Sequence, residues 1–311
     1  MNRILYLLLP TLLLLASCQR DKTDKTLRSV YYWSTTWDMD SSKADFIRRH
    51  HIQRIYLRYF DVVKEENGEM KPNATLQLAT PMEKGTEIVP VVFIVNDCMR
   101  NLSPQGGRNL AGRILKRILQ MSEANDIHGV REIQMDCDWT ASTEQTYFDF
   151  LKTLREKARE RKILLSATIR LHQLPTAPPP VDRGVLMMYN TGDARQLDCR
   201  KPILDMRDAA PYIQHLGSYP LPLAAAYPLF RWRILFRDRK FVGIMHADED
   251  FPVLPDDSIV IRQPEMADIM EAVRAVSHQN RDINDEVILF DLGTDNIKQF
   301  KPEDYEQIYR H

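Results

Sequence analysis

The stretch Glu132-Ile-Gln-Met-Asp-Cys-Asp-Trp-Thr140 has the composition of a buried strand whose last positions include carboxylates. Because side chains alternate along a strand, one face carries Ile133, Met135, Cys137 and Trp139, and the other carries Gln134, Asp136, Asp138 and Thr140. Carboxylates are costly to bury. Asp136 and Asp138 therefore either belong to a catalytic or binding site or form a structural ion pair with a nearby Arg. This strand alone leaves both alternatives open.

Around this strand, short runs rich in β-forming residues alternate with helical patterns. We expect strands at residues 30–37, 54–61, 87–96, 131–140, 163–170, 184–190, 221–227 and 287–292, and helices at 41–51, 109–125, 143–161 and 264–277. Eight strands in this rhythm predict an α/β fold, the (β/α)8 TIM barrel. A doubly wound open sheet is the alternative, but it would usually carry a Gly-rich phosphate loop after its first strand, and residues 30–40 contain no Gly.

One segment interrupts the alternation. Residues 231–245 follow the seventh strand and predict an insertion, a hairpin or lid over the barrel mouth. Its Trp232 and Phe236 either contact a sugar ring or simply pack the insertion onto the barrel, and packing is the commoner role of such side chains.

The N-terminus has the pattern of a bacterial lipoprotein. A short basic start precedes an apolar run at residues 4–16, which is shorter than the roughly 20 residues that span a bilayer, and Leu15-Ala-Ser-Cys18 is a lipobox. We expect a signal peptide at 1–17, an acylated Cys18 that anchors the protein in a membrane, a tether at 18–28 and a barrel domain at 29–311. Gln19, by its resemblance to Gram-negative sorting signals, favours the outer membrane. A plain secretory signal with an incidental Cys18 is the alternative.

Composition excludes several classes of partner. The formal net charge is -1 and no long basic patch is present, which argues against binding of nucleic acid. Cys98, Cys137 and Cys199 fit no zinc-binding spacing, so neither a metal nor another cofactor is expected. Because an odd number of thiols cannot all pair and Cys137 should face the helix layer, we expect buried free thiols.

The strand at 133–140 resembles a motif of glycoside hydrolase family 18, the chitinase-like TIM barrels. That family carries D-x-x-D-x-D-x-E on its fourth strand, and Asp136 and Asp138 match its second and third acidic positions. Ile133 stands in place of the first Asp, and Thr140 in place of the terminal Glu. The chain is also similar to bacterial lipoproteins of glycosidase-like fold.

A second motif agrees with the first in order and strand number. Met187-Met-Tyr-Asn190 is similar to the M-x-Y-D/N of that family's sixth strand. The resemblance implies that Tyr189 and Asn190 hold the N-acetyl group of a sugar.

The missing Glu decides what chemistry remains. In the resembled family this Glu protonates the glycosidic oxygen, and the hydroxyl of Thr140 is too weak an acid to do so. Asp138 is the expected replacement acid, with Asp136 tuning it, because two neighbouring carboxyl groups raise the pKa of one of them. Asp61 and Asp291, at the ends of the second and eighth strands, are the next carboxylates within reach.

Other side chains join the predicted substrate site. Arg58 is in phase with Phe60, and Arg170 with Thr168, so both point into the barrel mouth, where they either neutralise the aspartates or grip an acidic sugar. Trp139 completes the set of substrate-binding candidates.

Two candidates have ordinary structural alternatives. Asp291 is as well suited to cap the turn at residues 293–294. His172 has the chemistry of an acid or base, but a lone His is more often incidental.

Two functions stay open for this envelope lipoprotein. One is hydrolysis of a glycan with Asp138 as the acid, and the other is binding of a glycan by a barrel that has lost the catalytic Glu. A second carboxylate at about 5–9 Å from Asp138 favours hydrolysis, whereas aspartates sealed by Arg favour binding.

Overall fold

The computed structural model describes residues 26–82 and 85–311. The predicted signal peptide, the lipobox and Cys18 lie outside the described residues. Among the helices that the structure describes, none is long and apolar enough to cross a membrane.

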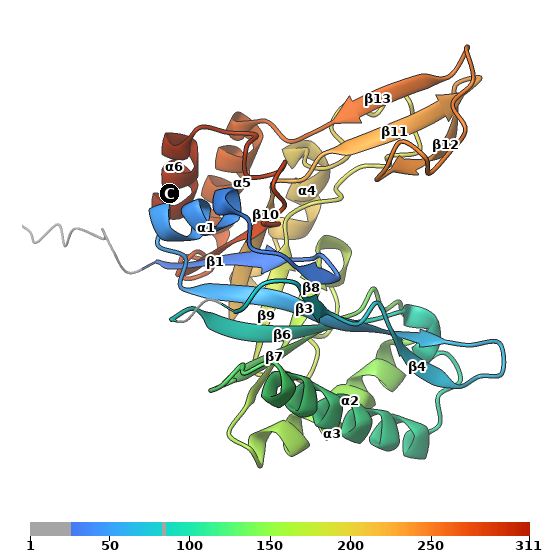
Figure 1. Cartoon of the computed structure of the whole chain (residues 1–311), viewed down its shortest axis with the longest axis vertical. Coiled ribbons are helices and arrows are strands. Elements are labelled where there is room, and N and C mark those ends of the chain that lie inside the picture. Colours follow the sequence, from blue (N-terminus) through green and yellow to red (C-terminus); the bar gives the residue numbers. More distant parts are fainter. Residues whose placement is uncertain (1–25, 83–84) are drawn as a thin grey trace, which may run out of the picture.

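Eight parallel strands form a closed barrel, as the sequence predicts (Figure 1). In barrel order they are β1 (Leu27–Tyr32), β3 (Arg54–Lys64), β6 (Glu87–Ile94), β7 (Glu132–Asp136), β8 (Leu164–Arg170), β9 (Arg183–Met187), β10 (Leu223–Pro228) and β14 (Glu286–Phe290). The barrel closes because β1 pairs with both β3 and β14. β1 takes in Leu27 and Arg28, which the sequence analysis places in the tether.

Helices cover most of the crossovers between these strands. They are α1 (Ser41–Arg49), α2 (Pro104–Ala124), α3 (Glu144–Arg159), α4 (Met206–Ile213), α5 (Met266–Gln279) and α6 (Pro302–Arg310), with 3-10 turns η1 (Asn96–Met99), η2 (Leu171–Gln173) and η3 (Leu216–Ser218). In the described part of the chain, two crossovers have no α-helix. The β8–β9 crossover contains η2, and the β3–β6 crossover contains β4 (Met70–Asn73) and β5 (Gln77–Leu78), of which β5 pairs with β2 (Thr36–Trp37).

The insertion after the seventh strand is present and larger than a hairpin. β11 (Trp232–Arg237), β12 (Lys240–Met245) and β13 (Ser258–Arg262) form an antiparallel sheet in the order β12-β11-β13 that projects beside the barrel mouth (Figure 1). Phe236 is buried, and the Trp232 ring lies 5.5 Å from the Phe230 ring at the end of β10. Both aromatic side chains therefore pack, as the commoner alternative has it.

A β-bulge in β3 changes which side chains face the mouth. Arg58 pairs with Val91 and Phe60 pairs with the next residue, Val92, so one extra residue is inserted between them. The predicted common phase of Arg58 and Phe60 is therefore wrong. Phe60 lies against α2, where the Arg117 guanidinium is 5.1 Å from its ring, and Asp61 shares the inward face with Arg58.

Ion pairs fill the end of the barrel opposite the mouth. Glu286 accepts hydrogen bonds from Ser29 (2.6 Å), Tyr56 (3.0 Å), Arg54 (3.1 Å) and Arg183 (2.6 Å). Arg183 also binds Glu132, at 3.0 Å. These groups close the N-terminal end of the barrel, so the pocket lies at the carboxyl ends of the strands.

The three cysteines in the described residues are free, as predicted, but the prediction that all are buried is wrong for Cys199. Cys98 and Cys137 are buried, and Cys199 is half-buried. Cys137 faces the helix layer, where it lies near enough to Tyr147 on α3 to raise the pKa of that hydroxyl, after the larger effect of burial. Asp136 points the other way, toward Thr168 and Arg170, which confirms the alternation predicted for residues 133–137.

Candidate functional site

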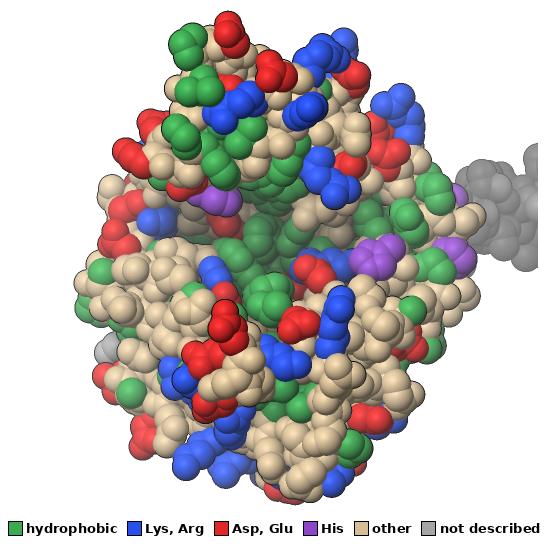
Figure 2. Space-filling view, turned by 90° about the vertical axis from the view of Figure 1, so that its right-hand side faces the viewer, with side chains coloured by type: hydrophobic (Ala, Val, Ile, Leu, Met, Phe, Trp, Pro, Cys, Tyr) green, Lys and Arg blue, Asp and Glu red, His purple; other side chains and the backbone are tan. Residues whose placement is uncertain are grey.

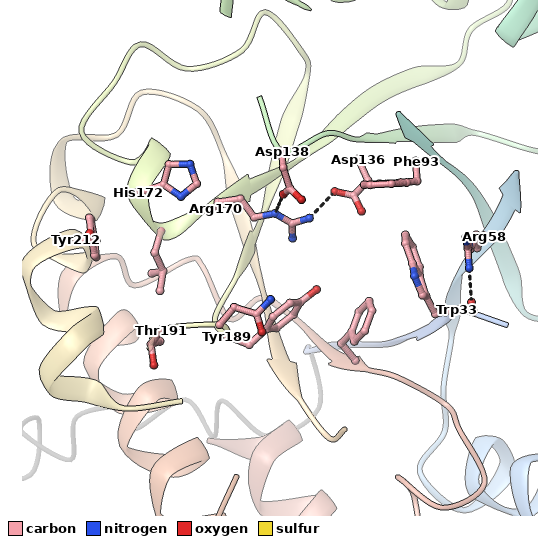
Figure 3. A pocket seen from close by; sticks show the side chains of 13 residues that line it. Trp33, Arg58, Phe93, Asp136, Asp138, Arg170, His172, Tyr189, Thr191 and Tyr212 are labelled. Carbon is pink, nitrogen blue, oxygen red and sulfur yellow. Dashed lines mark hydrogen bonds and ion pairs between the residues drawn. The ribbon is translucent and has the colours of Figure 1, made fainter. Parts of the chain in front are cut away.

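A pocket of about 470 Å³ lies at the barrel mouth. Figure 2 shows it as a hollow between the lobe formed by β11, β12 and β13 and the rest of the barrel, with hydrophobic side chains in its depth. Its lining combines five aromatic rings with charged and amide groups: Trp33, Arg58, Phe93, Asp136, Asp138, Arg170, Leu171, His172, Tyr189, Asn190, Thr191, Tyr212 and Phe290 (Figure 3).

Asp136 is the buried carboxylate of this pocket. It ends β7, is 3% exposed, and accepts hydrogen bonds from Thr168 Oγ1 at 2.6 Å and from Arg170 Nη2 at 2.9 Å, both on the adjacent strand β8. Burial raises the pKa of Asp136, and the guanidinium of Arg170 acts in the opposite direction. Burial and the cationic partner therefore have opposite effects on the pKa of Asp136.

Arg170 also binds the second aspartate of the motif. Its Nε donates a hydrogen bond to Asp138 Oδ1, so one guanidinium bridges Asp136 and Asp138 (Figure 3). The Asp138 side chain is 58% exposed, because β7 ends two residues earlier and the chain has left the barrel wall. The ion-pair alternative of the sequence analysis is therefore present, and it lies inside the pocket.

The residues of the second motif, Tyr189 and Asn190, line the same pocket as Asp136 and Asp138. Tyr189 and Asn190 follow β9, line the pocket, and lie across it from β7. Tyr189 is buried with its ring 5.1 Å from that of Phe290, and burial raises the pKa of its hydroxyl. Asn190 adopts a left-handed φ of 58°, which Asn tolerates better than most residues, and its side chain is exposed.

Arg58 binds protein groups at the edge of the pocket. Its Nε donates to Asp61 Oδ1 at 2.9 Å, and its Nη1 donates to the carbonyl oxygen of Trp33 at 3.2 Å. The guanidinium also lies 5.3 Å from the centre of the Trp33 ring. Asp61 is buried beneath this contact and is not among the residues that line the pocket in the described chain.

Trp139, a predicted site residue, and Thr140 lie outside the pocket lining. Thr140 contacts Ser142 through its hydroxyl at 3.1 Å, and its carbonyl accepts the Glu144 amide at the start of α3. Trp139 packs on Phe148 of α3, at 5.3 Å between ring centres. None of the described atoms of these side chains lines the pocket.

Asp291 binds its own turn. Its Oδ1 accepts the backbone N–H of Gly293 at 2.8 Å and the side-chain amide of Asn296 at 2.7 Å. Burial raises the pKa of this carboxyl, and the two hydrogen bonds act in the opposite direction. The arrangement is the turn cap that the sequence analysis names as the alternative for Asp291.

Several lining residues are absent from the sequence-based candidates. Trp33 extends the inward face of β1 beyond Tyr31, and Phe290 ends the inward face of β14, so strict alternation along those strands could have found both. Tyr212 comes from α4, a helix that no pattern in the sequence analysis predicts. The described residues contain no group of three or more His, Cys, Asp or Glu side chains that could hold a metal ion.

Comparison with known proteins supports the architecture. No family model and no curated protein sequence matches the chain. Among solved structures, the spore cortex-lytic enzyme SleL of Bacillus cereus is similar at 14% identity, with 92% of this chain and 74% of SleL covered and a TM-score of 0.57. The Group IV chitinase of Ostrinia furnacalis is similar at 12% identity, with 92% and 100% covered and a TM-score of 0.53.

A third solved structure carries the family designation. The GH18 chitinase ChiB from the chitin utilization locus of Flavobacterium johnsoniae is similar at 11% identity, with 91% of this chain and 94% of ChiB covered and a TM-score of 0.50. At such identities the similarity shows the fold. The chain therefore has the glycoside hydrolase family 18-like TIM barrel that its two strand motifs predict.

Proposed function

We propose that the protein is a cell-envelope lipoprotein whose barrel mouth binds a glycan without hydrolysing it. The observation that carries this proposal is the bridge from Arg170 to both Asp136 and Asp138. A guanidinium hydrogen-bonded to a carboxyl group favours its charged form, so the bridge opposes transfer of a proton from either group to a leaving group. Thr140, in place of the catalytic Glu, binds the start of α3 and leaves the pocket without that acid.

The lining of the pocket supports a sugar as the ligand. Sugar rings combine apolar C–H faces with a rim of hydroxyl groups, and the pocket offers aromatic rings together with carboxylate, amide and guanidinium groups. Tyr189 and Asn190, to which the resemblance assigns the N-acetyl group of a sugar, both line the pocket. A Group II chitinase domain of Ostrinia furnacalis, which is similar to this chain at 12% identity, was solved in complex with an N-acetylated chito-oligosaccharide. An N-acetylated glycan is thus the ligand class to test first.

Anchoring through Cys18 would turn the pocket away from the membrane. β1 begins at Leu27, nine residues after the lipobox Cys, at the end of the barrel opposite the mouth. A tether attached at that end leaves the mouth directed toward the surrounding glycans. The lipobox and Gln19 support placement in the outer membrane.

Binding and turnover are separated by one experiment on the full chain in detergent micelles. We expect tetra-N-acetylchitotetraose to bind, Asp138→Asn to weaken binding by about tenfold, and no reducing ends to be released. Asp45→Asn, a change on the exposed side of α1, is the matched control and should leave binding unchanged. Release of reducing ends that Asp138→Asn abolishes would show hydrolysis, and absence of binding to a panel of N-acetylated glycans would overturn the proposed ligand class.

Anchoring is tested independently of the ligand. Cys18→Ser should abolish metabolic labelling by a fatty-acid analogue and leave the unprocessed precursor. Cys199→Ser, which alters a half-buried free thiol of the barrel, should be labelled like the wild type. Equal labelling of both variants would contradict the lipoprotein assignment.

A further inference from the structure

We propose that Trp33 is the surface on which a sugar ring stacks in this pocket, that Arg58 is a positioning residue for Trp33, and that the bound sugar carries no acidic substituent. The inference rests on the proposed function and names the ligand class and the residues that select it. It replaces the expectation that Arg58 grips an acidic sugar.

Trp33 has the position of a stacking surface. It follows the last residue of β1, lines the pocket, and is half-buried, so part of its indole ring is open to a ligand. Its ring lies 5.5 Å from that of Phe290 and 6.0 Å from that of Tyr31, and these neighbours fix its orientation. The C–H face of a pyranose ring is apolar and packs favourably on such a ring.

Arg58 holds Trp33 and has its hydrogen bonds directed to protein groups. The side chain makes a two-pronged ion pair with Asp61, with Nε at 2.9 Å from Oδ1 and Nη2 at 2.5 Å from Oδ2. Its remaining nitrogen binds the Trp33 carbonyl, and the guanidinium packs on the indole ring. In the view of Figure 3, the Trp33 ring stands between Arg58 and the group formed by Asp136, Arg170 and Asp138.

The bulge in β3 brings Asp61 to the same face as Arg58, which allows their ion pair. Without the extra residue, Phe60 would share the inward face with Arg58, and Asp61 would face α2. With the bulge, Asp61 pairs with Phe93, a residue of the pocket lining, and its carboxylate meets Arg58. A local irregularity of one strand thus supplies the anion that fixes the guanidinium behind Trp33.

The charges of the mouth select against an acidic sugar. Both guanidinium groups of the described lining are paired with protein carboxylates, Arg58 with Asp61 below the pocket and Arg170 with Asp136 and Asp138. Neither guanidinium group is left without a protein carboxylate, and the most exposed of these carboxylates is that of Asp138. A carboxylate on the ligand would meet like charge at short range, which weakens binding.

The test compares two disaccharides that differ by one acidic group. Di-N-acetylchitobiose is neutral, and the N-acetylglucosaminyl-N-acetylmuramic acid disaccharide carries a lactyl carboxylate on the same scaffold. We expect the full chain in detergent to bind the neutral disaccharide at least tenfold more tightly. Trp33→Ala should weaken this binding by about tenfold, whereas Trp33→Phe should retain most of the affinity and lose the ligand-induced change in tryptophan fluorescence.

Arg58 variants separate positioning from direct contact. Arg58→Met should weaken binding of the neutral disaccharide several-fold, leave the preference for it unchanged, and reduce the Trp33 fluorescence response. Arg113→Met, a change of an exposed Arg on α2, is the matched control and should alter none of these quantities.

The outcomes distinguish this inference from the proposed function. Tighter binding of the acidic disaccharide that Arg58→Met abolishes would overturn the inference, as would unchanged affinity in Trp33→Ala. His172 is the remaining basic side chain of the described lining. If His172→Gln is the only variant that loses binding of the acidic disaccharide, His172 is the anion contact, and that result also overturns the proposal that the sugar is neutral. Binding of neither disaccharide to the wild type counts against the proposed function as well.

Discussion

At the scale of single residues, the carboxylates at the strand ends differ in what surrounds them. Asp136 is buried and paired with Arg170, and Asp138 is exposed and paired with the same guanidinium. Asp291 is held by an amide and a backbone N–H and has no cationic partner among its described hydrogen bonds. The chemistry open to each group therefore follows from its partner and its exposure.

The stability of the fold should depend on pH through Asp291. Burial raises the pKa of its carboxyl, so its contribution to the free energy of unfolding is fully present below the ordinary value for Asp. That contribution is lost as pH rises through the raised value. Asp291→Asn keeps the acceptor for Gly293 and cannot ionise, so the variant should gain stability relative to the wild type between pH 4 and pH 8.

Urea unfolding across this pH range measures the effect. Asp295→Asn, in the same turn but with a side chain 79% exposed, is the matched control and should follow the wild type. A difference between Asp291→Asn and the wild type that stays constant with pH would show that Asp291 does not titrate in this way.

At the scale of secondary-structure elements, two strands depart from the regular pattern, and both departures shape the pocket. β7 ends at Asp136, so Asp138 stands free of the barrel wall, and Thr140 belongs to the start of α3. β3 gains a residue at its bulge, which turns Asp61 inward. Local strand geometry therefore decides which members of each motif reach the pocket.

Close packing between strands makes a prediction about β9. A Cβ added at Gly184 would lie 2.7 Å from Leu223 Cδ2 and 2.9 Å from Ile169 Cγ1, both closer than side-chain atoms normally approach. Gly184→Ala should therefore lower the free energy of unfolding by about 1–3 kcal/mol.

A second glycine provides the opposite control for the same substitution. A Cβ at Gly112 in α2 meets no atom within 4 Å, so Gly112→Ala should raise the free energy of unfolding by about 0.5–1 kcal/mol. Thermal unfolding of the two variants compares them directly. A stabilising Gly184→Ala would mean that the contacts of β9 with its neighbouring strands are looser than described.

At the scale of the whole molecule, the two ends of the barrel have different tasks. The mouth carries paired charges that line a pocket, whereas the opposite end carries paired charges that close the interior. Glu286 connects strands β1, β3 and β9 through Ser29, Arg54, Tyr56 and Arg183, and its side chain is 6% exposed. A single carboxylate at the end opposite the pocket therefore connects three strands to β14.

Neutralising Glu286 should destabilise the barrel. Glu286→Gln removes one of the two carboxylates that Arg54 and Arg183 share, the other being that of Glu132, which should cost about 3 kcal/mol of unfolding free energy. Glu87→Gln changes a side chain that is 22% exposed and pairs with Arg54, and it should cost about 1 kcal/mol. Equal losses in the two variants, measured by urea unfolding, would contradict a special role for Glu286.

The sequence by itself determined the barrel, the place of its insertion and the two motifs that face each other across the mouth. Alternation along a strand is a property of the backbone, so residues 133–137 revealed their inward and outward faces without any knowledge of their neighbours. The order of strands and helices likewise predicted closure into eight parallel strands.

Only the tertiary structure decided how the site is connected. The register of β8 against β7 lets Arg170 bridge two aspartates. The bulge in β3 lets Asp61 support Arg58. The placement of α4 brings Tyr212 to the pocket. Such contacts join residues distant in sequence. They are set by packing between elements, which no local pattern of residues encodes.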